Sequence, residues 1–115
     1  MIPVPAGVRI YLAMGATDMR KGFDGLALVV QEVLKKDPYS GHLFLFRGRR
    51  ADKIKILYYD TTGLCLFANR LQRGRFVWPV SRAGVVTLTP AELAMLVEGL
   101  DWRAAERTWK PDLAG

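Results

Sequence analysis

Basic side chains are concentrated in one third of this 115-residue chain. The segment from residue 47 to residue 82 has nine lysines and arginines against two acids, Asp52 and Asp60, whereas the whole chain carries a net charge of only +6. This segment therefore holds all of the excess positive charge. Such a concentration suggests a polyanionic partner. The nine residues are Arg47, Arg49, Arg50, Lys53, Lys55, Arg70, Arg73, Arg75 and Arg82.

The candidate nucleic-acid-binding residues are the first eight of these. Most of their contacts are expected to go to phosphates, which position a protein on DNA without reading its sequence. Aromatic residues lie among them, and some could stack on bases. We expect most of these aromatics in the core, because a small β domain needs large core side chains. The candidate residues are Arg47, Arg49, Arg50, Lys53, Lys55, Arg70, Arg73 and Arg75.

The side chains that could do catalytic chemistry do not form a recognisable set. A two-metal nuclease needs about three convergent carboxylates, and the acids of this chain are scattered. Asp60 fits a turn, His42 opens a strand without a nucleophilic partner, and the single cysteine, Cys65, lies in an apolar segment. We therefore expect no catalytic residues, no metal and no cofactor. A small metal-dependent nuclease using Asp52 or Asp60 is kept as an alternative.

Five strand-like segments and two helices must position the basic residues. Apolar spacing predicts a helix from Phe23 to Lys36, with Thr17 or Asp18 as its cap. The segment Thr89-Pro90-Ala91-Glu92 is a capping box that begins a second helix, for which Gly99 is the expected terminator. A turn after residue 71 leads into an apolar segment at 76–78. The five predicted strands are 8–12, 42–47, 53–60, 64–71 and 85–88.

Short joints between the middle strands predict antiparallel hairpins. The turn at 61–63 would place Lys53 beside Arg70 and Leu57 beside Leu66. If the loop 48–52 joins its strands at Arg47 and Lys53, those two are neighbours as well. Arg47, Lys53 and Arg70 would then form a row on one face of the sheet, with the loops at 48–50 and 73–75 beyond it.

The expected fold is α+β in a single domain covering residues 1–115. A mainly antiparallel sheet of about five strands carries the first helix on one face, and the capped helix closes an edge or the other end. Residues 101–115, with Trp102 and Trp109, are expected as a loosely docked tail. The sequence has no apolar run long enough to cross a membrane and no leader pattern, so we expect a cytoplasmic protein.

Three blocks of sequence resemble one family over nearly the whole chain. The blocks at 17–26, 37–60 and 70–79 are similar to the TnpB-type accessory proteins of the IS66 group of bacterial insertion sequences, where this protein is the second open reading frame. Segments 89–93 and 98–102 continue the match. The resemblance implies a protein encoded beside the transposase and needed for efficient transposition, with the strand-transfer chemistry in the transposase. It implies no catalytic residues for the small protein.

These observations lead to two main hypotheses. In the first, the protein is a non-catalytic accessory subunit that binds element DNA, or the transposase–DNA complex, through the basic hairpin region. In the second, it is an adaptor that docks on the transposase without touching DNA, using the basic patch or the Trp102 and Trp109 tail. The sequence leaves the oligomeric state, the strand order and any DNA sequence preference open.

Overall fold

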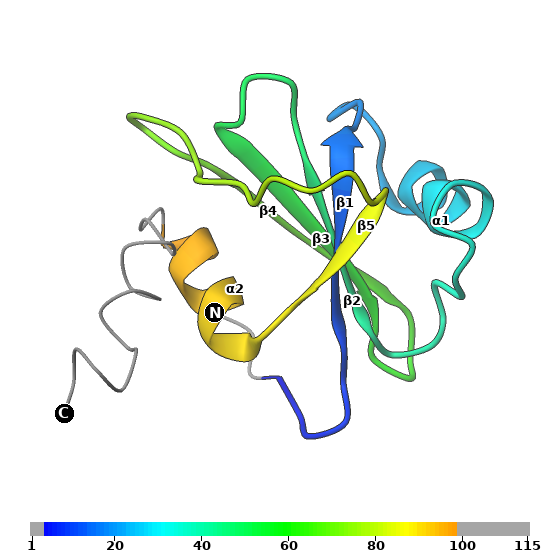
Figure 1. Cartoon of the computed structure of the whole chain (residues 1–115). Helices are drawn as coiled ribbons and strands as arrows, with labels where there is room; N and C mark the ends of the chain where they lie inside the picture. Colours follow the sequence, from blue (N-terminus) through cyan, green and yellow to red (C-terminus); the bar gives the residue numbers. More distant parts are fainter. Residues whose placement is uncertain (1–3, 99–115) are drawn as a thin grey trace, which may run out of the picture.

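Five short, largely apolar segments build one mixed β-sheet, which two helices cover (Figure 1). The computed structural model describes residues 4–98. The strand order across the sheet is β4-β3-β2-β1-β5. In chain order the elements are β1 (Ile10–Ala16), α1 (Phe23–Glu32), β2 (Leu43–Arg47), β3 (Lys53–Tyr59), β4 (Leu64–Arg70), β5 (Val85–Leu88) and α2 (Pro90–Val97).

One parallel pair decides where the loops lie. β1 and β2 run parallel and are joined through α1, whereas the pairs β2–β3, β3–β4 and β1–β5 are antiparallel. The α+β prediction with a mainly antiparallel five-stranded sheet is therefore confirmed. Because β1 and β2 end on the same side, the loops that follow β1, β2 and β4 all lie at one end of the sheet.

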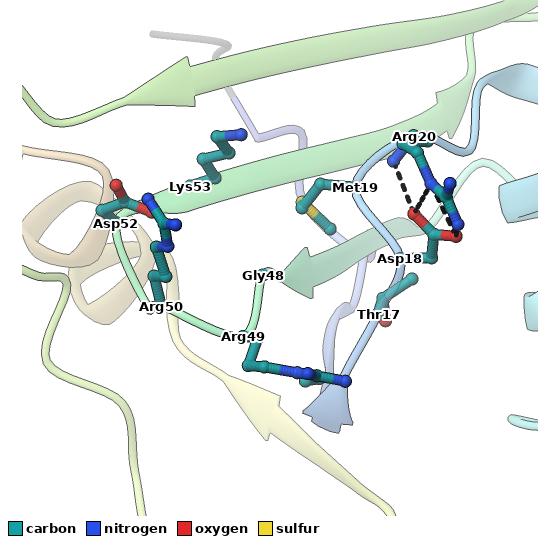
Figure 2. Close-up of a pocket in the computed structure, with 10 residues that line it drawn as sticks. Thr17, Asp18, Met19, Arg20, Gly48, Arg49, Arg50, Asp52 and Lys53 are labelled. Carbon is teal, nitrogen blue, oxygen red and sulfur yellow. Dashed lines mark hydrogen bonds and ion pairs between the residues drawn. The ribbon is translucent and has the colours of Figure 1, made fainter.

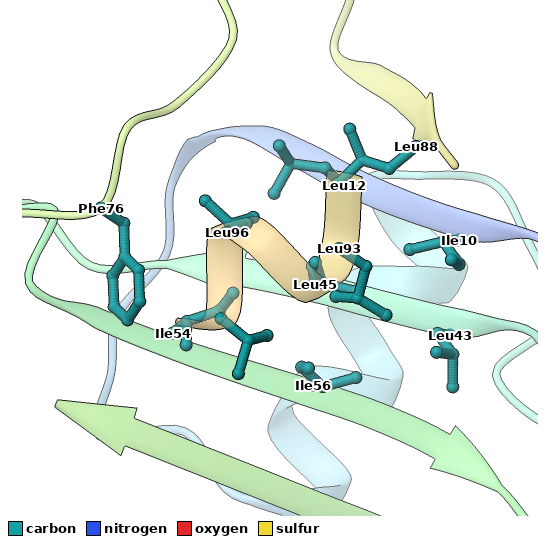
Figure 3. Close-up of a cluster of buried hydrophobic side chains, with 11 residues drawn as sticks. Ile10, Leu12, Leu43, Leu45, Ile54, Ile56, Phe76, Leu88, Leu93 and Leu96 are labelled. Atoms are coloured by element: carbon teal, nitrogen blue, oxygen red, sulfur yellow. The ribbon is translucent and has the colours of Figure 1, made fainter. Parts of the chain in front are cut away.

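The two faces of the sheet carry separate cores. On one face, Phe44 and Phe46 of β2 pack with Leu26 and Val30 of α1. On the other, Leu93 and Leu96 of α2 pack onto the sheet (Figure 3). We expected the capped helix to close an edge or an end, but it covers this second face. It does so because every interior strand has apolar side chains on both of its faces. The sheet residues under α2 include Ile10, Leu12, Leu43, Leu45, Ile54 and Ile56.

The two helices differ in how they are capped and in how their observed bounds compare with the predicted ones. At α2, Thr89 accepts a hydrogen bond from the Glu92 backbone N–H at 3.1 Å, and Glu92 accepts one from the Thr89 N–H at 2.9 Å, which confirms the predicted capping box. Helix α1 begins after Gly22 with no side-chain cap, so Thr17 and Asp18 are wrong as caps. It ends at Glu32 instead of Lys36, because Lys35 takes a left-handed conformation with φ of 57°.

The predicted bounds of the first strand also change. The strand runs over β1, beginning two residues later than predicted and continuing to Ala16. The apolar segment 76–78 lies outside the sheet, and Phe76 inserts its ring into the α2-side core, with only 2 % of its surface exposed. Phe67 is half-buried against the same core. The predicted terminator Gly99 and the tail with Trp102 and Trp109 lie outside the described residues. In the range 4–98, neither helix is long and apolar enough to cross a membrane.

Candidate nucleic-acid interface

Three loops come together at one end of the sheet and bring exposed basic side chains with them (Figure 1). They are the β1–α1 loop (17–22), the β2–β3 loop (48–52) and the first part of the β4–β5 connection (71–75). We call the exposed basic residues of these loops and of the adjoining strand ends the basic end. Its members are Arg20, Arg49, Arg50, Lys53, Arg70, Arg73 and Arg75.

The register of the sheet confirms one half of the predicted basic row and corrects the other. Lys53 pairs with Arg70, and Leu57 pairs with Leu66, as predicted. Arg47 does not pair with Lys53: it lies opposite Ile54, and the Gly48 N–H donates to the Lys53 carbonyl at 3.2 Å. Since successive side chains in a strand point to opposite faces, this one-residue offset sends Arg47 to the α2 face. Lys53 and Arg70 lie on the α1 face.

Arg47 is partly buried and bound to the backbone of the neighbouring strand. Its Nε and Nη2 both donate to the Met14 carbonyl oxygen, at 3.1 and 3.0 Å. The guanidinium carbon lies 5.8 Å from the centroid of the Trp78 ring. Hydrogen bonds on one side and an aromatic face on another hold this guanidinium in one orientation.

Lys55 is bound internally as well. Its ammonium donates to the carbonyl oxygens of Met19 and Lys21, at 2.7 and 2.8 Å. Both acceptors belong to the β1–α1 loop, so Lys55 ties this loop to β3. Two of the eight predicted binding residues, Arg47 and Lys55, therefore use two of their donors each on the protein itself.

Backbone hydrogen bonds join the three loops to one another. The Thr17 N–H donates to the Arg47 carbonyl at 2.8 Å, which links the first loop to the end of β2. Across the second loop, the Phe76 N–H donates to the Ala51 carbonyl at 2.7 Å, and the Leu71 N–H donates to the Asp52 carbonyl at 2.9 Å. The exposed arginines thus project from a surface whose backbone is fixed at several points.

Arg20 belongs to the basic end, although the sequence pattern did not place it there. Its guanidinium forms an ion pair with Asp18, with Nη2 to Oδ2 at 2.8 Å (Figure 2). The hydrogen bond from this side chain, helped by the Arg20 backbone N–H, holds the pKa of the Asp18 carboxyl well below its usual range. The signal that could have located Arg20 is a parallel β1–β2 pair, because a β-α-β unit places the loop after its first strand beside the loop after its second.

Two hollows border the β2–β3 loop, and a third lies beside them over β3 and β4. One, of about 560 Å³, lies between this loop and the β1–α1 loop and is lined by Asp18, Arg20, Arg49, Arg50 and Lys53 among others (Figure 2). A second, of about 580 Å³, lies on the side of the 71–75 loop. A third, of about 300 Å³, extends from Met19 and Lys53 to Arg70. Since neighbouring hollows share lining residues, the basic end is one continuous, indented surface.

Gly48 allows the first two loops to approach each other. A Cβ atom at this position would lie 2.9 Å from the Cγ of Met19, closer than real Cβ contacts. We expect Gly48→Ala to destabilise the fold by about 1–3 kcal/mol, because Met19 and its loop must shift. Urea denaturation measures the change. Gly63→Ala is the matched control, since nothing lies within 4 Å of a Cβ there; equal stability of both variants and the native protein would contradict the close contact.

Three residues considered for catalysis, Asp60, His42 and Cys65, have surroundings that indicate a structural role. Asp60 accepts hydrogen bonds from the Thr62 hydroxyl and from the backbone N–H groups of Thr62 and Gly63, which lower its pKa to about 2. His42 accepts a hydrogen bond from the Arg9 N–H at 2.9 Å. Burial raises the pKa of the Cys65 thiol, which disfavours the reactive thiolate. Within residues 4–98, no three His, Cys, Asp or Glu side chains gather in a way that could hold a metal ion.

Comparisons with known proteins give this geometry a context. The chain is 50% identical to the protein y4hO of Sinorhizobium fredii over all 115 residues of both chains. It is 37% identical to y4jC of the same organism over 107 residues, which are 93% of this chain and 92% of the relative. No solved structure matches it. The model of the family described as "IS66 Orf2 like protein" matches residues 8–107. The chain therefore belongs to the IS66 Orf2-like family, the TnpB-type accessory proteins of IS66 insertion sequences.

Proposed function

We propose that this protein is a non-catalytic DNA-binding subunit of IS66 transposition, which holds DNA on the basic end. The observation that carries the proposal is the convergence of seven exposed lysine and arginine side chains, from three separate loops, on one end of the sheet. In that region the acids are Asp18, which is paired with Arg20, and Asp52. So uneven a distribution creates a positive field that attracts a polyanion.

The proposal assigns different roles to seven of the eight residues predicted from the sequence. Arg49, Arg50, Lys53, Arg70, Arg73 and Arg75 are exposed and form the contact surface, to which Arg20 adds a seventh side chain. Lys55 has a supporting role, because its donors are used on the β1–α1 loop. The exposed set consists of charged side chains, and the three loops themselves (17–22, 48–52 and 71–75) contain no aromatic residue. This favours contact with the phosphate backbone over stacking on unpaired bases.

The fixed backbone of the basic end favours DNA binding as well. A surface that is already ordered loses little conformational entropy when a ligand binds. The hydrogen bond from Thr17 to the end of β2, together with those from Leu71 and Phe76 to the β2–β3 loop, holds the exposed arginines on a stable frame. The side chains still have to be ordered on the DNA, but the loops that carry them do not.

A charge-reversal experiment tests the proposal. We expect Arg49→Glu/Arg50→Glu to abolish binding to IS66-end DNA in a mobility-shift titration, because it places two negative charges at the centre of the contact surface. The matched control is Arg9→Glu/Lys35→Glu, which makes the same change in net charge at exposed positions on the opposite end of the sheet. Binding of the native protein should also weaken steeply with salt, as counterions are released from the phosphates that it contacts.

The two possible failures have different meanings. Equal losses of DNA binding in the basic-end variant and in the control variant would mean that overall charge, and not the basic end, drives binding. If the native protein bound no DNA but co-purified with its transposase from nuclease-treated lysate, the adaptor hypothesis would replace this one. Binding by the control variant together with loss in Arg49→Glu/Arg50→Glu is the result that supports the proposal.

A further inference from the structure

We propose that one backbone phosphate of the bound DNA occupies the hollow between the β2–β3 loop and the 71–75 loop. Arg47, one of the residues that line this hollow, would donate hydrogen bonds to that phosphate. This inference rests on the proposed function and names one contact within it. The hollow, of about 580 Å³, is lined by four arginines, one acid and two small residues. These are Arg47, Arg49, Arg50, Arg75, Asp52, Ala51 and Gly74.

Arg47 differs from the other arginines of the hollow in being oriented before any ligand arrives. The two hydrogen bonds to the Met14 carbonyl use Nε and Nη2, and the Trp78 ring lies beside the guanidinium. Nη1 makes no hydrogen bond to the part of the chain that the structure describes. A planar guanidinium has five N–H donors, so this arrangement leaves donors over at the one arginine of the hollow that is partly buried.

A merely structural role would not require an arginine at this position. One carbonyl oxygen needs a single donor, and a lysine ammonium would supply it. A guanidinium that is bound on one edge and free on the other presents a fixed set of donors, which suits the paired oxygens of a phosphodiester. Arg49, Arg50 and Arg75 are exposed at the same hollow and can approach the same group from its rim.

The lining also favours phosphate over a nucleobase. Apart from the arginines, the hollow has Ala51, Asp52 and Gly74, and none of these offers a broad apolar surface for a base. Arginines outnumber the single carboxylate four to one. A small oxyanion with two hydrogen-bond-accepting oxygens fits this donor set, and a DNA backbone supplies such groups at regular intervals.

The test exchanges lysine for arginine at this position. Arg47→Lys keeps the positive charge but loses the planar fork, so we expect it to weaken binding to IS66-end DNA about tenfold or more. The slope of log affinity against log salt should stay close to the native value, because the charge is kept, whereas a variant that removes a charge should lower the slope by about one. Arg73→Lys, at an exposed arginine outside the hollow, should lose clearly less DNA affinity than Arg47→Lys. Arg9→Gln, on the opposite end of the sheet, should leave affinity unchanged.

Stability must be measured alongside binding, because Arg47 also supports β1. If Arg47→Lys does not fold, Arg75→Gln tests the hollow from its exposed rim, and a fall of about one in the salt slope is expected. NMR of the arginine side chains gives an independent readout: the Arg47 guanidinium resonance should shift on addition of DNA and also on addition of inorganic phosphate.

Three results would overturn the inference. They are native-like affinity in Arg47→Lys, a native salt slope in Arg75→Gln, and an Arg47 resonance that does not move while DNA binds elsewhere on the basic end. Each of these leaves the proposed function standing. If the native protein binds no DNA, the proposed function fails instead, and the phosphate titration alone decides whether the hollow binds this anion. Displacement by an acidic peptide of the transposase, with no response to DNA or phosphate, would assign the hollow to a protein partner.

Discussion

Lys55→Met is expected to lower the free energy of unfolding by about 2 kcal/mol, because it removes two hydrogen bonds from a charged donor. The ammonium of Lys55 binds the carbonyls of Met19 and Lys21, at 2.7 and 2.8 Å, and methionine keeps an unbranched side chain that is one atom shorter and has no donor. The β1–α1 loop would lose its attachment to β3. Urea denaturation measures the stability, and hydrogen exchange at residues 17–22 should become faster.

Lys53→Met is the matched control, since it makes the same change two residues earlier on the same face of β3. Lys53 is exposed, and surface substitutions of this kind usually change stability by less than about 0.5 kcal/mol. The two variants should therefore separate: Lys53→Met weakens DNA binding and leaves the fold intact, whereas Lys55→Met destabilises the fold. Equal stabilities would show that Lys55 does not support the loop.

Phe44→Ala is expected to be more severe, with a loss of about 3–5 kcal/mol. Phe44 is fully buried beneath α1, and its ring stacks on that of Tyr11 with centroids 5.6 Å apart. The substitution leaves a cavity between the two parallel strands and the helix that joins them. Because this β-α-β unit determines where the β1–α1 loop lies, the variant should also alter the basic end. Urea denaturation gives the change in stability.

The comparison variant for Phe44→Ala is Leu28→Ala on the outer side of α1. Leu28 is 54% exposed, so it contributes little to the core, and we expect a change of at most about 0.5 kcal/mol. A small loss in Phe44→Ala, similar to that in Leu28→Ala, would mean that α1 does not depend on this packing. The position of the first loop would then need another explanation.

Local features of this fold could be read from single stretches of sequence. The capping box at Thr89 depends only on residues within one helical turn, so its spacing was sufficient to predict it. The pairing of Lys53 with Arg70 followed from a short turn, because a tight connection leaves little freedom in register. The helix end at Glu32 could not be predicted in the same way, since Lys35 adopts a left-handed conformation that favours glycine.

The sequence by itself determined that positive charge would be concentrated around residues 47–75, because charge depends on composition and not on conformation. It did not determine which of these side chains are free to bind. Only the tertiary structure decided that, through two facts that involve distant segments. The parallel pairing of β1 with β2 brings Arg20 to the basic end, and the one-residue offset opposite Arg47 turns that side chain to the other face. Both depend on contacts between residues far apart in the chain, which local spacing does not record.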